Sequence, residues 1–409
     1  MYKVLYNITI SFIASLLPLV GVFSPKVKRF IAARAKTNIP TKGNVSFWIH
    51  CASLGEYEMA IPLIHELLKS HSLNNLLITF FSPSGYEQVK NGPYASRIMY
   101  LPLDTPKNVK EFYDNYNPAK GLFIRYDFWH NFIRYGMNKG TQFYLVNGRF
   151  QADHFIFKFF GKNYLNLIRD FEYLFTSDNT SYELLKKINK NSVFVGDTRY
   201  DRVADISKTA KEYPDIHHFK GKRKLLIVGS SWKKEEALTK KLLDTNPNRI
   251  AVIIAPHDIQ RTDQILEVFK SYSPKCYTHS DFDEKTLVLV LDTIGMLSSL
   301  YRYADFSLIG GGFHGALHNI IEPAVWGNHV SFGPKIQKFP EAHDAIEHDF
   351  GFAITHEDRW IQMINNLIQN QQKLIEVKEK SKKFVTDQQQ ATRKITGYIL
   401  KKTDNERLF

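Results

Sequence analysis

The sequence predicts an α/β protein made of two consecutive doubly wound domains, preceded by one apolar helix. Three observations support this prediction. Short apolar segments alternate with amphipathic ones from Val45 onward, a polar stretch at 207–223 interrupts the alternation, and a second series follows it. A chain of 409 residues also exceeds what one compact core usually holds. We expect an anchor at 1–25, a first domain at 38–205 and a second domain at 222–395.

The amino-terminal segment runs from Val4 to Phe23 without a charged side chain. Twenty such residues are enough to span a bilayer. Basic residues follow the run directly, whereas only Lys3 precedes it; they are Lys26, Lys28, Arg29, Arg34 and Lys36. The positive-inside rule then predicts a single membrane anchor in contact with phospholipid, with the body of the protein in the cytoplasm. A cleaved signal peptide and a buried apolar helix are the alternatives.

In the first domain, each apolar segment of strand length is followed by a turn and a helical pattern. The segment 45–51 predicts a strand, and 57–70 predicts a helix with Ala60, Ile61, Ile64, Leu67 and Leu68 on one face. Further strands are predicted at 76–81, 97–103, 121–126, 143–148, 172–177 and 193–197. Short apolar strands that alternate with helices indicate a parallel sheet.

The second domain repeats this pattern with strands predicted at 224–231, 249–256, 286–292, 305–312 and 329–333. The last fifty residues are polar and helix-rich. Two doubly wound domains of similar size, without an internal sequence repeat, describe the GT-B architecture, which is typical of nucleotide-sugar enzymes. Ligands are expected at the carboxyl ends of the strands, in a cleft that the two Rossmann-like domains face.

The net charge of +13 favours anionic partners such as nucleic acid, acidic phospholipid or a phosphorylated substrate. The sequence has no zinc-finger spacing, RNP1-like segment or basic heptad region, so we expect no nucleic-acid partner. It also lacks a P-loop and a nucleophile elbow. The two cysteines, Cys51 and Cys276, fit a reducing compartment, and Cys51 is predicted to be a small core residue.

Signals for a metal or cofactor are weak. Asp281 and Asp283 form a D-x-D pattern, but their polar surroundings predict a solvated loop. His314 and His318 have an i, i+4 spacing without a third ligand nearby. We therefore expect neither a metal site nor a cofactor.

The first candidate site is the segment HCASLGEYE at 50–58, between a predicted strand and a predicted helix. Ser53 and Glu56 have the spacing of a capping box, which needs no function. Alternatively, Glu56 is a general base, because the helix dipole keeps a carboxylate ionised where it can take a proton from an acceptor hydroxyl.

The second candidate site is SLIGGGFHGALHNIIEP at 307–323. Glycines such as Gly311 allow backbone amides to approach a phosphate, and Asn319 and Glu322 open a predicted helix whose amino terminus favours an anion. A Gly-rich turn with a helix cap is the alternative. Weaker candidates lie at other strand ends of the second domain: Ser230, Ser231, Pro256, His257 and the segment 292–297.

Nine motifs occur in an order that resembles the 3-deoxy-D-manno-octulosonic acid (Kdo) transferases of lipopolysaccharide synthesis. They are ASLGE (52–56), SPSGYE (82–87), DFWHN (127–131), NGRF (147–150), GDTRYD (196–201), DTIGML (292–297), GGGF (310–313), HNIIEP (318–323) and FGPKIQKF (332–339). The resemblance implies an inverting, metal-independent GT-B enzyme of the inner membrane. It implies CMP-Kdo as donor, a lipid A precursor as acceptor, and Glu56 as the catalytic base.

The resemblance also implies roles for other positions. Arg125 stands where the family usually has a glutamate thought to assist the transition state, and Arg199 where it has a lysine. The implied CMP contacts are Pro256, His257, Ile294, Gly295, Met296, Asn319, Ile320, Ile321 and Glu322.

The chain departs from the family pattern at three places. The usual Pro-Arg-His is Pro256, His257, Asp258 here, so a phosphate-binding arginine is missing or replaced by Arg261. The usual Met-Gly-Glu is Ile294, Gly295, Met296 here, so only backbone contacts can be carried over to these positions. The change of sign at position 125 leaves Asp127 as the only nearby acid. Two alternatives therefore stay open: another GT-B enzyme, such as a UDP-sugar transferase or epimerase, and a catalytically silent membrane-bound homologue.

Overall fold

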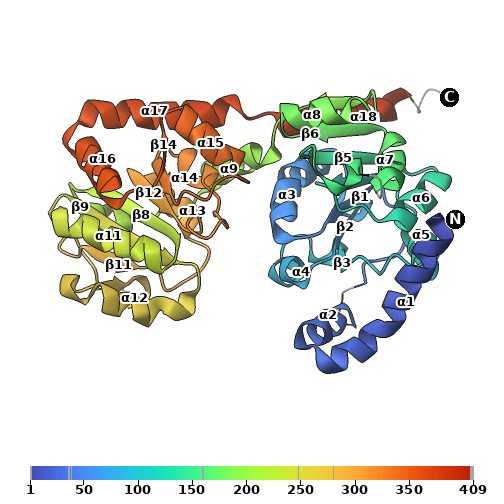
Figure 1. Ribbon diagram of the computed structural model, residues 1–409, viewed down its shortest axis with the longest axis horizontal. Helices are drawn as coiled ribbons and strands as arrows, with labels where there is room; N and C mark the ends of the chain where they lie inside the picture. Colours follow the sequence, from blue (N-terminus) through green and yellow to red (C-terminus); the bar gives the residue numbers. More distant parts are fainter. Residues whose placement is uncertain are drawn as a thin grey trace. The chain divides into compact units, whose positions relative to one another are not determined.

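The computed structural model describes residues 2–35, 37, 39–158, 161–246, 248–279 and 281–405. These residues form two compact units (Figure 1). Unit 1 holds the described residues up to Arg202 and again from Gln389 onward, and unit 2 holds Val203–Gln388. The division differs from the predicted one, because the carboxyl-terminal helix belongs to unit 1 and not to the second domain.

Unit 1 is built on a seven-stranded parallel sheet in the order β3-β2-β1-β4-β5-β6-β7. The strands lie where the apolar segments predict them: β1 Phe47–Cys51, β2 Leu76–Phe80, β3 Ile98–Tyr100, β4 Lys120–Ile124, β5 Gln142–Gly148, β6 Tyr173–Thr176 and β7 Ser192–Phe194. The order reverses between β1 and β4, which is the switch point where doubly wound sheets bind ligands at the carboxyl ends of their strands.

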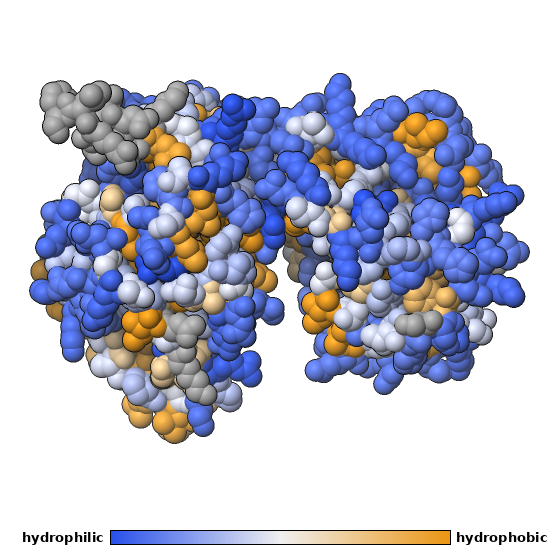
Figure 2. Space-filling view, turned by 180° about the vertical axis from the view of Figure 1, so that it is seen from behind, coloured by the Kyte–Doolittle hydropathy of each residue, from blue (hydrophilic) through white to orange (hydrophobic). Residues whose placement is uncertain are grey.

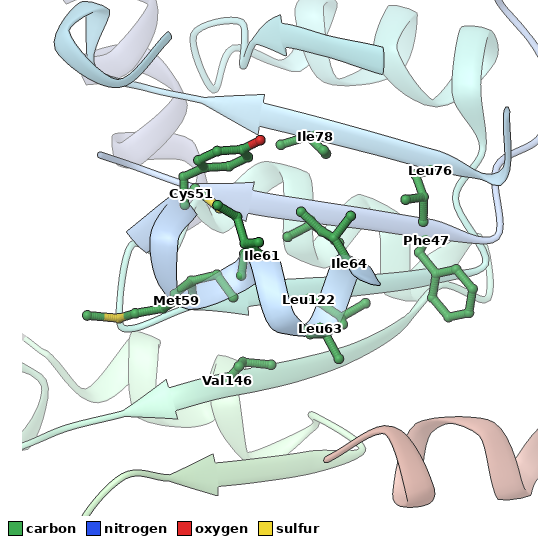
Figure 3. Close-up of a cluster of buried hydrophobic side chains, with 14 of the residues drawn as sticks. Phe47, Cys51, Met59, Ile61, Leu63, Ile64, Leu76, Ile78, Leu122 and Val146 are labelled. Atoms are coloured by element: carbon green, nitrogen blue, oxygen red, sulfur yellow. The ribbon is translucent and has the colours of Figure 1, made fainter. Parts of the chain in front are cut away.

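Helices cover both faces of this sheet. They are α3 Leu54–Leu68, α4 Pro83–Val89, α5 Pro106–Tyr116, α6 His130–Asn138, α7 Lys162–Arg169, α8 Asn179–Leu185 and α18 Ala391–Asn405. The predicted face of α3 is buried: Figure 3 shows Ile61 and Ile64 of this helix pointing toward Ile78, Leu122 and Val146 of the strands. The strands contribute to a second apolar core on their other face. Because β1 and α3 are packed on two sides, the turn between them is held firmly.

The carboxyl-terminal helix α18 completes the core beside α3. Its Ile395 and Ile399 are fully buried in the same cluster as Ile61. Asp201 holds the start of this helix, because its carboxylate accepts the backbone N–H of Gln390 at 2.6 Å and both the N–H and the hydroxyl of Thr392 at 2.7 Å. A residue 191 positions away in the sequence therefore serves as the helix cap.

Unit 2 contains a second seven-stranded parallel sheet, in the order β10-β11-β9-β8-β12-β13-β14. Its strands are β8 Lys224–Ser231, β9 Ile250–Pro256, β10 Lys275–Cys276, β11 Val288–Val290, β12 Phe306–Ile309, β13 His329–Phe332 and β14 Gly351–Ala353. Its helices are α10 Pro214–Lys220, α11 Lys233–Thr245, α12 Thr262–Val268, α13 Leu297–Leu300, α14 Ile321–Ala324, α15 Pro340–Glu347, α16 Glu357–Gln369 and α17 Gln371–Asp387. The predicted α/β architecture with two parallel sheets is thus confirmed.

The polar stretch at 207–223 is not a simple linker. Helix α9, Thr198–Thr209, runs across the boundary between the two units, and α10 follows it. Ile216 and Phe219 of α10 are fully buried, which ties this stretch to unit 2.

The amino-terminal segment forms an apolar helix, α1 Tyr2–Phe23, and a basic helix, α2 Pro25–Ala35. The apolar helix is long enough to cross a membrane, with a mean hydropathy of 1.8 and only 6% of its most apolar window buried. Figure 2 shows apolar surface gathered at the lower end of unit 1, where α1 and α2 lie. The exposed apolar side chains are Val4, Leu5, Ile8, Phe12, Ile13, Leu19, Val20, Val22 and Phe23. Lys36, the last of the predicted basic residues, lies outside the described residues.

Both ends of this segment contact the body of unit 1. The Tyr6 hydroxyl donates to the Asp104 carboxylate at 2.7 Å, and Asn7 accepts a hydrogen bond from the Asn131 side chain at 2.7 Å. At the other end, Arg34 donates to the carbonyl of Phe81 at 2.7 Å. The helical pair therefore rests against unit 1 at its start and at its finish.

Candidate functional site

Glu56 lies in the first turn of α3, directly after the carboxyl end of β1. The helix begins there because the Ser53 side chain accepts the N–H of Glu56 at 3.5 Å. The Glu56 carboxylate in turn accepts the N–H of Ala52. The capping box is thus present in a modified form, since the sequence predicts that Glu56 reaches the N–H of Ser53.

The surroundings of Glu56 change its acidity. Burial raises the pKa of its carboxyl, and the Asp127 carboxylate adds to this, whereas the Ala52 N–H, His50 and Arg125 act in the opposite direction. A base is most effective when its pKa lies near the working pH. The raised pKa therefore suits a carboxylate that must accept a proton and later release it.

His50 and Asp127 form a fixed pair beside this carboxylate. The fully buried His50 ring contacts Thr79 Oγ1 through Nδ1 at 2.9 Å and Asp127 Oδ2 through Nε2 at 2.9 Å. The Trp129 indole N–H donates to the same Asp127 oxygen at 3.0 Å. Hydrogen bonds that involve β1, β2 and the turn at Trp129 thus hold the Asp127 carboxylate in place near Glu56.

Arg125 acts on the Glu56 carboxyl, and Arg199 acts in turn on Arg125. Arg125 follows β4 and adopts a left-handed backbone conformation with φ +67°, which is uncommon for a residue other than glycine. Burial lowers the pKa of Arg125, and Asp197 partly restores it. The expectation that Asp127 is the only acid near Arg125 is therefore wrong, because Asp197 also faces it.

Asp197 is the centre of this arginine group. Its carboxylate accepts Arg199 Nε at 3.0 Å and lies 2.9 Å from the terminal nitrogen of that guanidinium. Burial opposes ionisation of Asp197, yet Arg199 and Arg125 together lower the pKa of its carboxyl. Arg149 and Arg199 both lie near enough to Arg125 to lower its pKa, and Arg149 lies 3.8 Å from the Asp178 carboxylate.

A pocket of about 650 Å³ lies in unit 2, at the carboxyl ends of β9 and β11. Of the residues that the resemblance assigns to CMP, Pro256, His257, Ile294 and Gly295 line it. Ile294 is 86% exposed, so its side chain is available to an apolar ligand surface. Trp232 and Arg261 complete this side of the pocket.

The remaining predicted contacts do not line this pocket. The side chains of Ser231, Met296, Ile320 and Ile321 are buried, so only their backbones can reach a ligand. Ser230 has a left-handed φ of +51° at the end of β8. Asn319 precedes α14 and donates to the carboxylate of Glu322, which lies in this helix, at 3.1 Å.

The glycine-rich turn is explained by packing within the chain. A Cβ on Gly310 would lie 1.9 Å from the carbonyl oxygen of Ser230, and one on Gly311 would lie 2.0 Å from that of Ala316. The N–H groups of Gly310 and Gly311 donate to Gly229 O at 2.9 Å and to Glu235 at 3.2 Å. The expected phosphate cradle therefore has two of its amides already bonded.

The predicted helix after this turn is a single turn, Ile321–Ala324, and the N–H of Ile321 donates to the Asn319 side chain at 3.0 Å. An anion site at this helix terminus is not supported. Among the described residues, no group of three or more His, Cys, Asp or Glu side chains is placed to hold a metal ion.

Two buried acids that the sequence analysis missed organise this side of unit 2. Glu235 accepts the N–H of Trp232 at 3.2 Å and joins the start of α11 to the glycine turn. Glu236 accepts the Ser231 hydroxyl at 3.0 Å and binds both terminal nitrogens of Arg261, at 2.8 and 2.7 Å. Acids in the first turn of a helix are common caps, so their spacing alone could not reveal these long-range partners.

Comparisons with known proteins are consistent with this arrangement. A model of the 3-deoxy-D-manno-octulosonic-acid transferase (kdotransferase) family matches residues 27–202. A 3-deoxy-D-manno-octulosonic acid transferase of Aquifex aeolicus is 25% identical over 365 residues, which cover 88% of this chain and 94% of the relative. One of Chlamydophila psittaci is 27% identical over 320 residues, covering 74% of this chain and 72% of the relative. The chain is thus similar to Kdo transferases over most of its length.

Another relative is longer than this chain. A bifunctional glycosyltransferase/methyltransferase of Fusobacterium nucleatum is 25% identical over 362 residues, and the chain spans 56% of its length. Among solved structures, a UDP-N-acetylglucosamine 2-epimerase superposes with a TM-score of 0.60 at 12% identity, over 88% of this chain and 96% of that chain. A UDP-GlcNAc 2-epimerase of Methanocaldococcus jannaschii gives 0.54 at 13% identity, over 84% and 99%. These likenesses show the GT-B-like fold alone.

Proposed function

We propose that this chain transfers Kdo from CMP-Kdo to a lipid A precursor, with inversion at the anomeric carbon and without a metal ion. Similarity to Kdo transferases over most of the chain supports the donor and the class of reaction. The observation that carries the mechanism is a half-buried carboxylate, Glu56, which follows the carboxyl end of β1 and lies near Arg125.

In the proposed reaction, Glu56 takes the proton of the acceptor hydroxyl. The acceptor oxygen forms a bond to the anomeric carbon of Kdo as the bond from that carbon to the phosphate oxygen breaks, and CMP leaves with the bonding electrons. Because this anomeric carbon carries a carboxylate, the transition state combines a developing cation with a fixed anion. General base catalysis at such a centre contributes about 10²–10⁴-fold to the rate.

Arg125 and Arg199 are proposed to hold negative charge of the substrates near Glu56. Both guanidinium groups lie near the buried Asp197, and Arg125 also acts on the Glu56 carboxyl, which supports a role in holding an anionic group there. A fixed cation beside the base also keeps the carboxylate ionised. This role differs from that of the glutamate usually found at position 125, and it suits an acceptor that carries phosphate.

We also propose that α1 and α2 attach the enzyme to the inner membrane, with both units in the cytoplasm. The exposed apolar side chains of α1 and the basic residues Lys26, Lys28 and Arg29 of α2 support a phospholipid surface as the partner. The hydrogen bonds of Tyr6 and Asn7 to unit 1 favour a helix that lies along the membrane surface. A spanning α1, as the sequence predicts, requires these bonds to break.

A donor comparison tests the proposed activity. Purified enzyme is given CMP-Kdo or UDP-N-acetylglucosamine, each with and without the lipid A precursor, and nucleotide release is followed. We expect release of CMP that depends on the acceptor. Release of UDP instead would favour the second candidate, another GT-B nucleotide-sugar enzyme, which the fold alone allows. CMP binding without release would indicate a silent homologue.

A further inference from the structure

The nucleotide pocket of unit 2 lacks an unpaired permanent cation. Arg261 is the only Lys or Arg among the residues that line it. Both terminal nitrogens of Arg261 bind the Glu236 carboxylate, and its side chain is only 14% exposed. The Glu236 carboxylate offsets the charge of this guanidinium, and the Ser231 carbonyl accepts a further bond from it at 3.2 Å. A nucleotide phosphate that enters this pocket must therefore find its positive charge elsewhere.

A group of aromatic and imidazole rings stands at the same edge of the pocket. His257 stacks on Trp232, with ring centroids 4.4 Å apart and planes inclined by 22°. His318 lies on the far side, with its ring centroid 4.8 Å from that of His257. His257 is exposed and lines the pocket. The indole N–H of Trp232 is buried and has no protein partner.

This geometry favours a protonated histidine when an anion is present. The face of a tryptophan ring attracts a cation stacked on it, and His257 is stacked on Trp232 in this way. Without an anion, burial lowers the pKa of His318, and the neighbouring His257 lowers it further. A negative charge bound beside an imidazole favours its protonated form.

The other charged groups around the two rings do not supply this anion. Asp258 follows His257, and its side chain accepts the N–H of Gln260 at 3.0 Å. Glu236 is neutralised by Arg261, and Glu235 is turned toward the backbone of Trp232 and Gly311. His314 contacts the edge of Trp232 with ring centroids 5.4 Å apart.

We propose that His257 and His318, supported by the ring of Trp232, bind the donor's phosphate as a protonated imidazole pair, so that donor binding takes up a proton. This inference rests on the proposed function, because it assigns the phosphate contact of the same cytidine nucleotide. In this proposal an imidazolium charge, which exists only when the ligand is bound, takes the place of a permanent guanidinium charge. Donor affinity in this enzyme consequently depends on pH, and Arg261 acts as a positioning residue.

The test measures binding of cytidine 5′-phosphate methyl ester. This ester lacks the second ionisation of a phosphate monoester, which has a pKa of about 6, so its single negative charge stays constant from about pH 6 to about pH 9. Calorimetry at one pH in buffers of different ionisation enthalpy gives the number of protons exchanged. We expect uptake of about one proton per ligand at pH 7.5, and a dissociation constant that rises by up to about tenfold per pH unit above neutrality. Cytidine without a phosphate should bind more weakly and without proton uptake.

Variants assign the protons to the two rings. His257→Gln and His318→Gln should each lose most of the proton uptake and most of the pH dependence. His217→Gln changes an exposed histidine of α10 and should bind like the wild type. Melting temperatures check that each variant is folded, and the wild-type measurement stands without any variant.

Three results would overturn the inference. The first is ester binding by the wild type without proton uptake. The second is a dissociation constant that does not change with pH, and the third is proton uptake that survives in both folded variants. Failure of the proposed function is seen in a different assay, because a wild type that binds the ester with proton uptake but releases no CMP from CMP-Kdo would refute the transfer and not the phosphate contact.

Discussion

The Glu56→Gln substitution separates the two roles that the β1–α3 turn permits. Glutamine keeps a side-chain oxygen that can accept the Ala52 N–H, so the cap at Ser53 survives. The exchange replaces a charge-assisted hydrogen bond with a neutral one, which costs about 1 kcal/mol. It also removes a carboxylate whose ionised form is penalised by burial. The two effects oppose each other, so we expect little change in the melting temperature.

The pH dependence of the free energy of unfolding follows from the direction in which the pKa of Glu56 is shifted. Because burial raises the pKa of Glu56, the folded state binds the proton more tightly than the unfolded state does. The stabilisation from this proton is complete below the unfolded pKa and is lost as pH rises through the folded pKa. At pH 8 the wild type therefore carries the cost of a buried charge that Glu56→Gln lacks. The variant should melt at the same temperature as the wild type or slightly above it.

Turnover should respond very differently. Glutamine cannot accept a proton, so the initial rate of Kdo transfer at saturating substrates should fall by about 10²–10⁴-fold. CMP affinity in calorimetry should not change, because the nucleotide contacts are proposed on unit 2. The wild-type rate should also fall on the acid side of a pH profile, with a midpoint above the usual value of about 4.3 for a glutamate, and this limb should vanish in the variant.

Glu66→Gln is a matched control, because Glu66 lies on the same helix and forms an exposed ion pair with Lys69. It should keep wild-type turnover. If Glu56→Gln retained more than about a tenth of the wild-type rate, the loss would be too small for a general base, and Glu56 would have only its structural role.

Three further changes test other parts of the account. Asp201→Asn should lower the free energy of unfolding by about 1–3 kcal/mol in urea titrations, because it weakens the cap of α18; an unchanged midpoint would mean that this cap is not used in solution. Glu322→Ala should weaken CMP binding by about 1–3 kcal/mol with an unaltered melting temperature, and equal affinity in calorimetry would move the nucleotide contact elsewhere. Deletion of residues 2–24 should leave a folded protein that high salt releases from anionic vesicles; wild type that already stays soluble at low salt would refute membrane attachment.

The strands could be predicted because both faces of a parallel sheet are buried, which gives continuous apolar runs. The segment 224–231 coincides with β8 for this reason. The return of α18 to unit 1 could not be predicted, since it depends on Asp201 contacting Thr392 across 191 positions. Helix α10 was missed because Ile216 and Phe219 are its only buried residues in a short polar segment.

The candidate site shows the same division between local and distant information. The position of Glu56 at a helix start could be predicted, because its spacing from Ser53 is typical of a helix that begins after a strand. Its role as a base is implied by the resemblance to Kdo transferases. The pairing of Arg261 with Glu236 and the stacking of His257 on Trp232 depend on side chains more than twenty positions apart, and no local pattern encodes them. The glycine turn was recognised, but its glycines serve close backbone packing rather than a demonstrated phosphate contact.

The most direct test of the central claim is the mass of the lipid product. Purified full-length enzyme is incubated with a CMP-Kdo generating system and a lipid A precursor, and the lipid is weighed by mass spectrometry. The account predicts a gain equal to one or more Kdo units with wild type and Glu66→Gln, and a strongly reduced gain with Glu56→Gln. An acceptor whose mass stays unchanged in the presence of active, CMP-binding wild type would contradict the proposed transfer.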